Sequence, residues 1–356
     1  MRERALTAVS LYSGAGGMDL GFVRAGFKVL WANDVDDLAC RTYAENIGEH
    51  ITCGDLESVS LPTDAAPDTV IGGPPCQGFS VIGRMDPGDP RSRHLSRFLD
   101  VVEQLRPRAF VLENVKALAV SRRWALTRDE LIRRSRELGY RTRLSVLNAA
   151  DFDVPQARER MFLIGIRETD PPEVLPTTAD RPPTVRDALK SLPPFGQPGN
   201  DTTCRAKVIP ASTPVLRPNA YRGSLLFNGS GRPLDLDAPA KTLPAAMGGN
   251  ATPIVDQEEL AHGASPWVVE YHAHLLAGGM PVEQAPTRMR RITVEEAAVL
   301  QSFPPGYRFH GTRIAQYRQI GNAVPPNLAQ YVAAALRDVL SMTESQRPRP
   351  QTALAV

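Results

Sequence analysis

The stretch VIGGPPCQGFS, residues 70–80, places one cysteine, Cys76, behind two glycines and two prolines. The prolines stiffen the turn, and the apolar residues before them predict a buried strand that ends just ahead of the thiol. A thiolate attacks at neutral pH when a positive charge or a helix N-terminus lowers its pKa. The setting of Cys76 therefore indicates a nucleophile, although a lone cysteine is more often a small buried hydrophobe.

An acid and two arginines end or precede other apolar runs. Glu113 closes the run AFVLENV, where a buried carboxylate is costly unless it is paired or functional. Arg158 and Arg160, in VPQARERMFLIGI, stand two residues apart just before a strand, and we expect them on one face. Such a pair could bind a phosphate or an aromatic carbonyl, and a surface ion pair is the alternative.

The segment LYSGAGGMDLG, residues 11–21, indicates a cofactor site at the end of the first strand. Its glycines let the backbone approach a ligand at a helix N-terminus. Asp34 ends the next strand, where an acid can bind ribose hydroxyls, and Asp55 is either a contact to an adenine amine or a turn residue. Asp19 replaces the third glycine of Gly-x-Gly-x-x-Gly, and nicotinamide, flavin and adenosylmethionine binders all share such a turn. The glycines concerned are Gly14, Gly16 and Gly17.

The first half of the chain alternates short apolar runs with helical patterns. This alternation predicts an α/β fold with a doubly wound, mostly parallel sheet, which binds ligands at the carboxyl ends of its strands. The predicted strands are 7–12, 28–34, 68–73, 109–115 and 161–166, and the predicted helices are 18–26, 38–47, 95–105 and 129–138.

The second half begins with a change in composition and in the regularity of the pattern. Eight prolines fall between residues 171 and 200, and the chain reads as irregular until about residue 285. A helical pattern returns with Thr293 and Glu296, which fit a capping box, and then in a helix that prolines open. This last helix has an apolar face, which must return to the first sheet to be buried. The face consists of Leu328, Val332, Ala335 and Leu336.

Composition indicates which class of protein the chain belongs to. The chain has 356 residues, 42% of them hydrophobic and 22% charged, as in globular proteins. It has neither an apolar run of about 18 residues nor an apolar signal core at its start. Its four cysteines lack the Cys-x-x-Cys spacing, which argues against a metal site and for a reducing compartment. The basic clusters at 91–97, 122–143 and 288–291 are either binding surfaces or solvated faces.

Taken in order, the motifs resemble those of cytosine-5 DNA methyltransferases of the bacterial restriction–modification type. They are SGAGGMDLG, GGPPCQGFS, ENV, PQARER, RRITVEEAAVLQSFP and QIGNAVPPNLA, and they cover residues 7–168 and 286–340. PPCQ followed by ENV and QxRxR is far more specific than a glycine turn. The resemblance implies a catalytic and cofactor-binding domain (1–180), a loop-rich target-recognition domain (181–285), a C-terminal return to the catalytic domain (286–342) and a disordered tail (343–356).

The resemblance also implies a reaction and its residues. Cys76 resembles the nucleophile that attacks carbon 6 of cytosine, and Glu113 the acid that contacts ring nitrogen 3 and the exocyclic amine. Arg160 resembles the arginine that holds the cytosine carbonyl, and Arg158 an active-site support. Carbon 5 then takes the methyl group of S-adenosyl-L-methionine, and loss of its proton releases the enzyme. The base must be flipped out of double-stranded DNA.

Further contacts follow from the same motifs. The implied cofactor contacts are Ser13, Gly14, Gly16, Gly17, Asp34, Val35, Asp55, Leu56, Pro75, Asn322, Ala323 and Val324. The implied DNA contacts are Gln77, Ser80, Arg84, Arg91 and Thr242, the last within a Thr-Leu element of the recognition domain. Two residues depart from the family pattern: Val35 stands where some members place an aromatic residue, and Asp153 where glycine is common.

Two other functions stay open from the sequence. A transfer-RNA cytosine methyltransferase would share the fold, but the 115 residues from 171 to 285 favour a reader of DNA. A non-catalytic adenosylmethionine- or DNA-binding protein would be expected to lose Cys76, Glu113 or an arginine of QARER, and all are present. The resemblance further implies a cytoplasmic protein, with a restriction endonuclease acting on the same site and no obligate protein partner.

Overall fold

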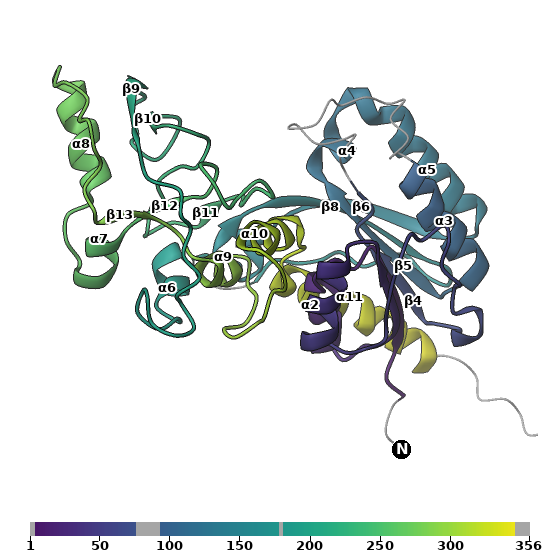
Figure 1. Ribbon diagram of the computed structural model, residues 1–356. Coiled ribbons are helices and arrows are strands. Elements are labelled where there is room, and N and C mark those ends of the chain that lie inside the picture. The colour runs from purple at the N-terminus through teal and green to yellow at the C-terminus, as the bar shows by residue number, and fades with distance from the viewer. Residues whose placement is uncertain (1–3, 76–92, 178–180, 346–356) are drawn as a thin grey trace, which may run out of the picture.

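The computed structural model describes residues 4–75, 93–177 and 181–345, with side chains described as far as residue 342. Figure 1 shows a larger part built on a central sheet and a smaller part that holds α6–α8 and β9–β13. Helices α9 and α10 lie between the two parts, and α11 crosses back beneath the sheet. None of the helices in the described residues is long and apolar enough to span a membrane.

The central sheet has seven strands in the order β3-β2-β1-β4-β5-β8-β6. The first five run parallel, and β8 runs antiparallel to both of its neighbours. This confirms the predicted mostly parallel sheet and the five predicted strands. The strands are β1 (Thr7–Leu11), β2 (Lys28–Asp34), β3 (Ile51–Cys53), β4 (Thr69–Gly72), β5 (Ala109–Val115), β6 (Arg141–Asn148) and β8 (Glu159–Ile166).

Strand β6 was missed by the sequence analysis. It lies at the edge of the sheet, so only one of its sides is paired, and most of its residues are partly exposed. Its sequence RTRLSVLN therefore lacks the continuous apolar run that marks a strand buried on both faces.

Helices cover both faces of the sheet. Successive residues of each strand point to opposite faces, so they belong to two different hydrophobic cores. Ala8 and Val111 belong to the core beneath α1 and α11, whereas Val9 and Phe110 belong to the core beneath α3 and α5. The helices of this part are α1 (Gly17–Arg24), α2 (Asp37–Asn46), α3 (Arg93–Leu105), α4 (Lys116–Val120), α5 (Ala125–Glu137) and α11 (Pro326–Ser345), with short 3₁₀ turns at Thr63–Ala65, Arg122–Trp124 and Ala149–Phe152.

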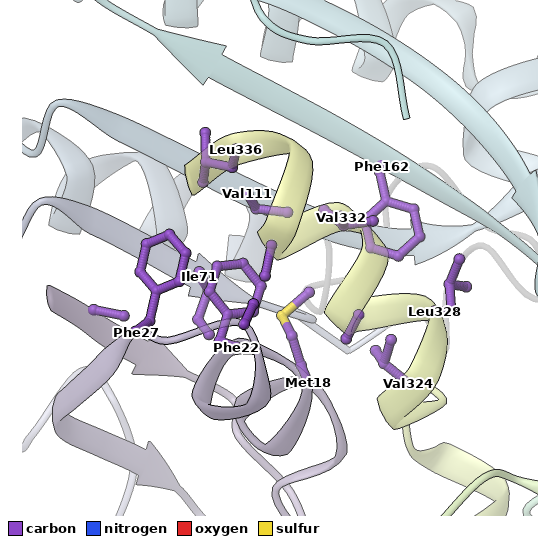
Figure 2. Close-up of a cluster of buried hydrophobic side chains, with 14 of the residues drawn as sticks. Met18, Phe22, Phe27, Ile71, Val111, Phe162, Val324, Leu328, Val332 and Leu336 are labelled. Atoms are coloured by element: carbon purple, nitrogen blue, oxygen red, sulfur yellow. The ribbon is translucent and has the colours of Figure 1, made fainter. Parts of the chain in front are cut away.

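The C-terminal helix packs on the front of the chain, as its apolar face predicts. Leu328, Val332 and Leu336 are fully buried in one core with Met18 and Phe22 of α1 (Figure 2). Ala335 is partly buried against the same core. The helix continues to Ser345, beyond the boundary that we expected at residue 342.

Gly21 makes the close contact between α1 and α11. A Cβ atom at this position would lie 2.5 Å from the Cβ of Ala329 and 2.6 Å from the backbone nitrogen of Gln330. Both distances are far below van der Waals contact, so the glycine sets how closely the two helices approach.

We therefore expect Gly21→Ala to lower the free energy of unfolding by about 1–3 kcal/mol, since overpacking a close contact forces backbone shifts. Chemical denaturation monitored by circular dichroism measures the change. Gly249→Ala is the matched control, because nothing lies within 4 Å of the added Cβ and its φ is not positive. Equal stability of the two variants would contradict the packing role of Gly21.

The smaller part is more regular than the sequence predicts. Residues 257–276 form two helices, although this region reads as irregular. Prolines and glycines flank both helices, which favours a prediction of irregular structure. The second helix, α8, is also short, so few of its apolar residues recur at helical spacing. The elements are α6 (Val185–Leu189), β9 (Pro210–Val215), β10 (Leu225–Phe227), β11 (Ala240–Lys241), β12 (Ile254–Asp256), α7 (Gln257–His262), α8 (Trp267–Leu276) and β13 (Met289–Arg291).

Strand pairing also places the return of the chain later than residue 286. Strand β13 pairs antiparallel with β12, so residues 289–291 lie with the smaller part. After β13, Thr293 caps α9 (Val294–Leu300) and forms the predicted capping box with Glu296. Helix α10 (Arg313–Asn322) follows and leads to α11.

Candidate active site

The turn that leads to Cys76 is anchored at the carboxyl end of β5. Cys76 itself lies outside the described residues, as do Gln77, Ser80, Arg84 and Arg91. Just before it, the carbonyl of Pro74 accepts a 3.1 Å hydrogen bond from the buried Nδ2 of Asn114. Asn114 thus ties the end of β4 to the end of β5. The sequence analysis missed this role, although the ENV motif contained the residue.

Glu113 and Arg160 form an ion pair at the same end of the sheet. The Nε of Arg160 lies 3.1 Å from Oε1 of Glu113, and both side chains are largely buried. The register of β5 and β8 pairs Val115 with Arg160, which puts Arg160 and Glu113 on one face of the sheet. On the other side, a Cβ at Gly73 would stand 3.0 Å from Oε2 of Glu113, so the backbone of this turn closely approaches the carboxylate.

Burial shifts the pKa of Glu113. Removal from water raises the pKa of this carboxyl, and the positive charges of Arg160 and then Arg158 oppose the rise. A carboxyl with a raised pKa holds its proton at a higher pH than an exposed one does. Glu113 is therefore suited to donate a proton or a hydrogen bond to a bound base.

Arg158 and Arg160, which we expected on one face, have different partners, and the alternative of a surface ion pair does not hold for the buried Arg158. Arg160 lies within β8, whereas Arg158 precedes the strand and is only 2% exposed. Arg158 donates hydrogen bonds to the carbonyls of Leu243 at 3.2 Å and Gly321 at 2.8 Å. Its guanidinium joins the smaller part of the molecule to the end of α10, and its role in the active site stays a prediction.

The predicted cofactor residues follow four strands that are neighbours in the sheet. Asp55 follows β3, Asp34 ends β2, Ser13 follows β1 and Pro75 follows β4. Since β3, β2, β1 and β4 are adjacent in that order and parallel, their carboxyl ends form one edge. The sheet topology therefore brings together residues that are up to 62 positions apart in the chain (Ser13 to Pro75).

Asp34 holds the first glycine turn at this edge. Its carboxylate accepts the backbone N–H of Gly14 at 2.7 Å and that of Asp36 at 2.9 Å. Burial raises the pKa of Asp34, and these two hydrogen bonds oppose the rise. A carboxylate can accept about four hydrogen bonds, so Asp34 keeps acceptor capacity for a ribose hydroxyl.

The three glycines of the turn serve different purposes. Gly14 has a φ of +55°, and a Cβ at this position would meet no atom within 4 Å, so its open side can receive a ligand. At Gly16 a Cβ would collide with Ile47, and at Gly17 it would lie 2.3 Å from the carbonyl oxygen of Val324. Packing within the protein thus excludes a side chain at Gly16 and Gly17, and a ligand contact by their backbone stays a prediction.

Beside Asp34 the surface suits an adenine ring and its amine. Val35 follows Asp34 and is 70% exposed, so its apolar surface is open at this edge. Asp55 is exposed, and its carboxylate accepts the backbone N–H of Glu57 at 3.0 Å. It therefore stabilises the turn and still presents its carboxylate to solvent. Leu56 is buried and Pro75 half-buried. The open glycine, the carboxylates and the exposed apolar residue fit a nucleoside cofactor.

The turn from α10 to α11 closes this edge from the C-terminal side. The carbonyl of Val324 faces Gly17, and the carbonyl of Ala323 accepts a 2.6 Å hydrogen bond from Gln301. Asn322, the last residue of α10, is exposed. The turn thus reaches the first glycine motif, as the C-terminal prediction required, and Asn322 is the residue with a side chain available to a ligand.

We therefore expect Asn322→Ala to weaken binding of S-adenosyl-L-methionine, measured by calorimetry, because the variant removes a polar contact at the cofactor edge. Since Asn322 is exposed, the melting temperature without cofactor should stay within a few degrees of the unchanged protein. Asn250→Ala, which alters an exposed asparagine of the smaller part, is the matched control. Unchanged cofactor affinity in folded Asn322→Ala protein would show that the pocket forms without this side chain.

Asp19 is a buried acid that the sequence analysis noted only as a departure from the glycine pattern. It is fully buried and accepts hydrogen bonds of 2.9 Å from both Ser10 and Tyr43. The hydroxyl of Ser13 in turn donates to Ser10 at 3.0 Å. Asp19 therefore connects the first turn of α1 to the glycine turn. Burial raises the pKa of Asp19 to about 6.

This pKa gives a pH-dependent stability. Between about pH 4 and pH 6 the unfolded chain has lost the proton of Asp19 while the folded protein still holds it, so stability falls as the pH rises. A rise from 3.8 to about 6 corresponds to about 3 kcal/mol. We expect the difference in free energy of unfolding between the unchanged protein and Asp19→Asn to depend on pH. As the pH rises from about 4 to about 6, the unchanged protein should lose about 3 kcal/mol relative to the variant. A difference that is flat with pH would contradict the buried titration of Asp19.

Asp153 occupies a backbone conformation that explains why glycine is common at its position. Its φ is +56°, in the left-handed region, which aspartate tolerates better than most residues. Two residues of α11 hold the turn: Tyr331 donates to the Asp153 carboxylate, and Asn327 donates to its carbonyl at 2.8 Å. The departure from the family pattern is therefore accommodated locally.

Thr242 lies where the two parts of the molecule meet. Strand β11 pairs with the two-residue strand β7 (Gln156–Ala157), and the exposed Thr242 donates its hydroxyl to the carbonyl of Ala157 at 3.0 Å. The Thr-Leu element is thus fixed next to the QARER segment. Its side-chain oxygen still has acceptor capacity on the exposed surface.

Comparisons with known proteins show the family of the chain. A family model described as C-5 cytosine-specific DNA methylase matches residues 6–338. The chain is 36% identical to Type II methyltransferase M1.HphI of Haemophilus parahaemolyticus, over 93% of this chain and 87% of that protein. It is 32% identical to Type II methyltransferase M.XorII of Xanthomonas oryzae pv. oryzae, over 97% and 88%.

Solved structures share the fold at lower identity. The Dnmt2 methyltransferase of S. pombe superimposes with a TM-score of 0.68 at 18% identity, covering 95% of this chain and 99% of that one. The methyltransferase EhMeth of Entamoeba histolytica gives 0.68 at 15% identity, with the same coverage.

Proposed function

Because the chain belongs to the C-5 cytosine-specific DNA methylase family, we propose that Cys76, Glu113 and Arg160 divide the methylation of cytosine in DNA among them. The chain is a DNA (cytosine-5-)-methyltransferase, and S-adenosyl-L-methionine supplies the methyl group. The observation that carries the proposed roles is the buried pair of Glu113 and Arg160. It lies beside the backbone turn that leads to Cys76, at the end of the sheet that also holds the cofactor residues.

The first step needs a thiolate and a proton donor. The sulfur of Cys76 bonds to carbon 6 of a flipped-out cytosine, and the electrons of the 5,6 double bond move toward carbon 5 and ring nitrogen 3. Glu113, whose pKa burial raises, supplies a proton or hydrogen bond to ring nitrogen 3 and so makes the electron shift easier. Carbon 5 becomes the nucleophile that accepts the methyl group.

The last step restores the enzyme. A base removes the proton from carbon 5, the electrons of that bond re-form the 5,6 double bond, and the bond from Cys76 to carbon 6 breaks. A proton that Glu113 gave to ring nitrogen 3 returns to Glu113. The thiolate is thereby regenerated, and the product is 5-methylcytosine.

Arg160 has two tasks in this scheme. Its Nε fixes Glu113 and its Nη1 donates to the carbonyl of Glu159 at 2.8 Å, so the guanidinium is oriented before the base arrives. A guanidinium has five N–H donors, and those left over suit the cytosine carbonyl. The pair is preorganised, and it stabilises charge that develops on the base.

The smaller part supplies the choice of DNA sequence in this proposal. It spans residues 181–285 in the sequence-based division, and its exposed Thr242 donates a hydrogen bond to the QARER segment. A restriction endonuclease that cuts the same site is the proposed biological partner, which agrees with the Type II relatives. Both proteins would act in the cytoplasm, where bacterial DNA lies.

Bisulfite sequencing tests the function directly. Chromosomal DNA from a host that lacks its own cytosine-5 methylation, and that expresses the chain, should show protected cytosines in one short sequence. Expression of Cys76→Ser should show none. Exchange of residues 181–285 for those of a relative with another target should change the protected sequence. Methylated cytosine in transfer RNA but not in DNA would contradict the proposal.

A further inference from the structure

Two buried side chains of the QARER segment bind the same residue of the smaller part. Gln156 accepts the backbone N–H of Leu243 at 3.0 Å, and Arg158 donates to the backbone carbonyl of Leu243 at 3.2 Å. Gln156 is 0% exposed, Arg158 2% and Leu243 1%. Both backbone groups of Leu243 are therefore held by the larger part, next to the exposed Thr242.

The same two side chains reach the turn at the cofactor edge. Arg158 donates to the carbonyl of Gly321 at 2.8 Å. Gln156 donates to the side chain of Gln301, which donates to the carbonyl of Ala323 at 2.6 Å. Two separate hydrogen-bonded links thus run from Leu243 to residues 321–323, one through an arginine and one through two amides.

Direct packing leaves little freedom between the two ends. A Cβ at Gly321 would lie 2.6 Å from the carbonyl oxygen of Pro244 and 2.6 Å from the Cα of Ala245, so the two backbones are in contact. Beyond them, the carbonyl of Val324 faces Gly17. Because close-packed interiors transmit displacement, a shift of Leu243 must move the cofactor turn, and the reverse also holds.

We propose that Gln156 and Arg158 are positioning residues that couple the DNA-recognition segment around Thr242 to the cofactor turn at 321–324. Binding at either end orders the other. This inference rests on the proposed function, which puts S-adenosyl-L-methionine at the turn and DNA at Thr242. The coupling is a shared free energy, so cofactor favours DNA binding by the same factor as DNA favours cofactor binding.

Hydrogen exchange with S-adenosylhomocysteine, the demethylated cofactor, tests the coupling without DNA. In the full chain, saturating ligand should slow amide exchange in residues 240–248 by about fivefold or more, the lower end of typical couplings. Gln156→Met and Arg158→Met should reduce this ligand-dependent factor to below about twofold. In both variants, residues 11–21 should still become protected, which shows that the ligand is bound.

Arg291→Met is the matched control. Arg291 is also a buried arginine, 3% exposed, and it donates to the carbonyls of Thr252 and Lys207, both within the smaller part. Its loss should cost stability but leave the ligand-dependent protection of residues 240–248 unchanged. If a methionine variant does not fold, Gln156→Glu and Arg158→Lys replace it, since each retains a polar group of similar length.

The outcomes separate this inference from the proposed function. If calorimetry detects no S-adenosylhomocysteine binding by the unchanged protein, the proposed cofactor site fails. If the ligand binds and protects residues 11–21 but not 240–248, the coupling is wrong and the function stands. Equal protection of residues 240–248 in the unchanged protein and in both methionine variants would overturn the assignment to Gln156 and Arg158.

Discussion

DNA that carries 5-fluorocytosine at the target position is expected to become covalently attached to Cys76 when S-adenosyl-L-methionine is present. After methyl transfer, carbon 5 holds a fluorine where it normally holds a proton. Fluorine cannot leave as a proton, so the last step stalls and the bond between sulfur and carbon 6 persists. The complex should survive denaturation and appear as a slower band on a denaturing gel, with the DNA mapped to Cys76 by mass spectrometry.

The variants of this experiment give an all-or-none contrast. Cys76→Ser should form no adduct, because a serine hydroxyl at neutral pH is a far weaker nucleophile than a thiolate. Cys204→Ser is the matched control, since Cys204 is a partly buried free cysteine of the smaller part. An adduct that persists in Cys76→Ser protein would remove Cys76 from the mechanism.

Glu113→Gln is expected to slow methyl transfer by about 100- to 10,000-fold, the usual contribution of a positioned general acid or base. Glutamine has nearly the shape of glutamate but cannot supply a proton to ring nitrogen 3. The variant also removes the negative charge beside Arg160, although the glutamine carbonyl can still accept a hydrogen bond from the guanidinium. The measurement is the single-turnover rate with saturating enzyme and tritiated cofactor.

Cofactor affinity separates a chemical role from a structural one. Glu113 lies near the end of β5, next to β4 and β8, whereas the nucleoside residues lie at the ends of β3, β2 and β1. Binding of S-adenosyl-L-methionine should therefore change by less than about twofold in Glu113→Gln, well below a tenfold effect of about 1.4 kcal/mol. Glu159→Gln is the control on the adjacent strand, because Glu159 is exposed and pairs with Lys116. Near-normal turnover in Glu113→Gln would return Glu113 to a structural role.

The prediction of strands from the sequence succeeded where the signal is local. A strand buried on both faces is an apolar run, so the positions of Asp34 and Glu113 near the ends of their strands follow from the residues beside them. The edge strand β6 and the helix α8 lack such runs, and both were missed. Their residues are stabilised by contacts with segments distant in the sequence, which no local pattern records.

The sequence by itself determined which residues could do chemistry, the class of fold that holds them and the family they resemble, because each depends on residue type and short spacing. Only the tertiary structure decided the direction of each side chain. Arg158, Gly16 and Gly17 are next to functional residues in the sequence, yet they contact Leu243, Ile47 and Val324. These partners are set by how α11 and the smaller part pack on the sheet. A spacing of two residues in QARER permits either a shared ligand or a buried link, and burial by the remainder of the chain selects the link.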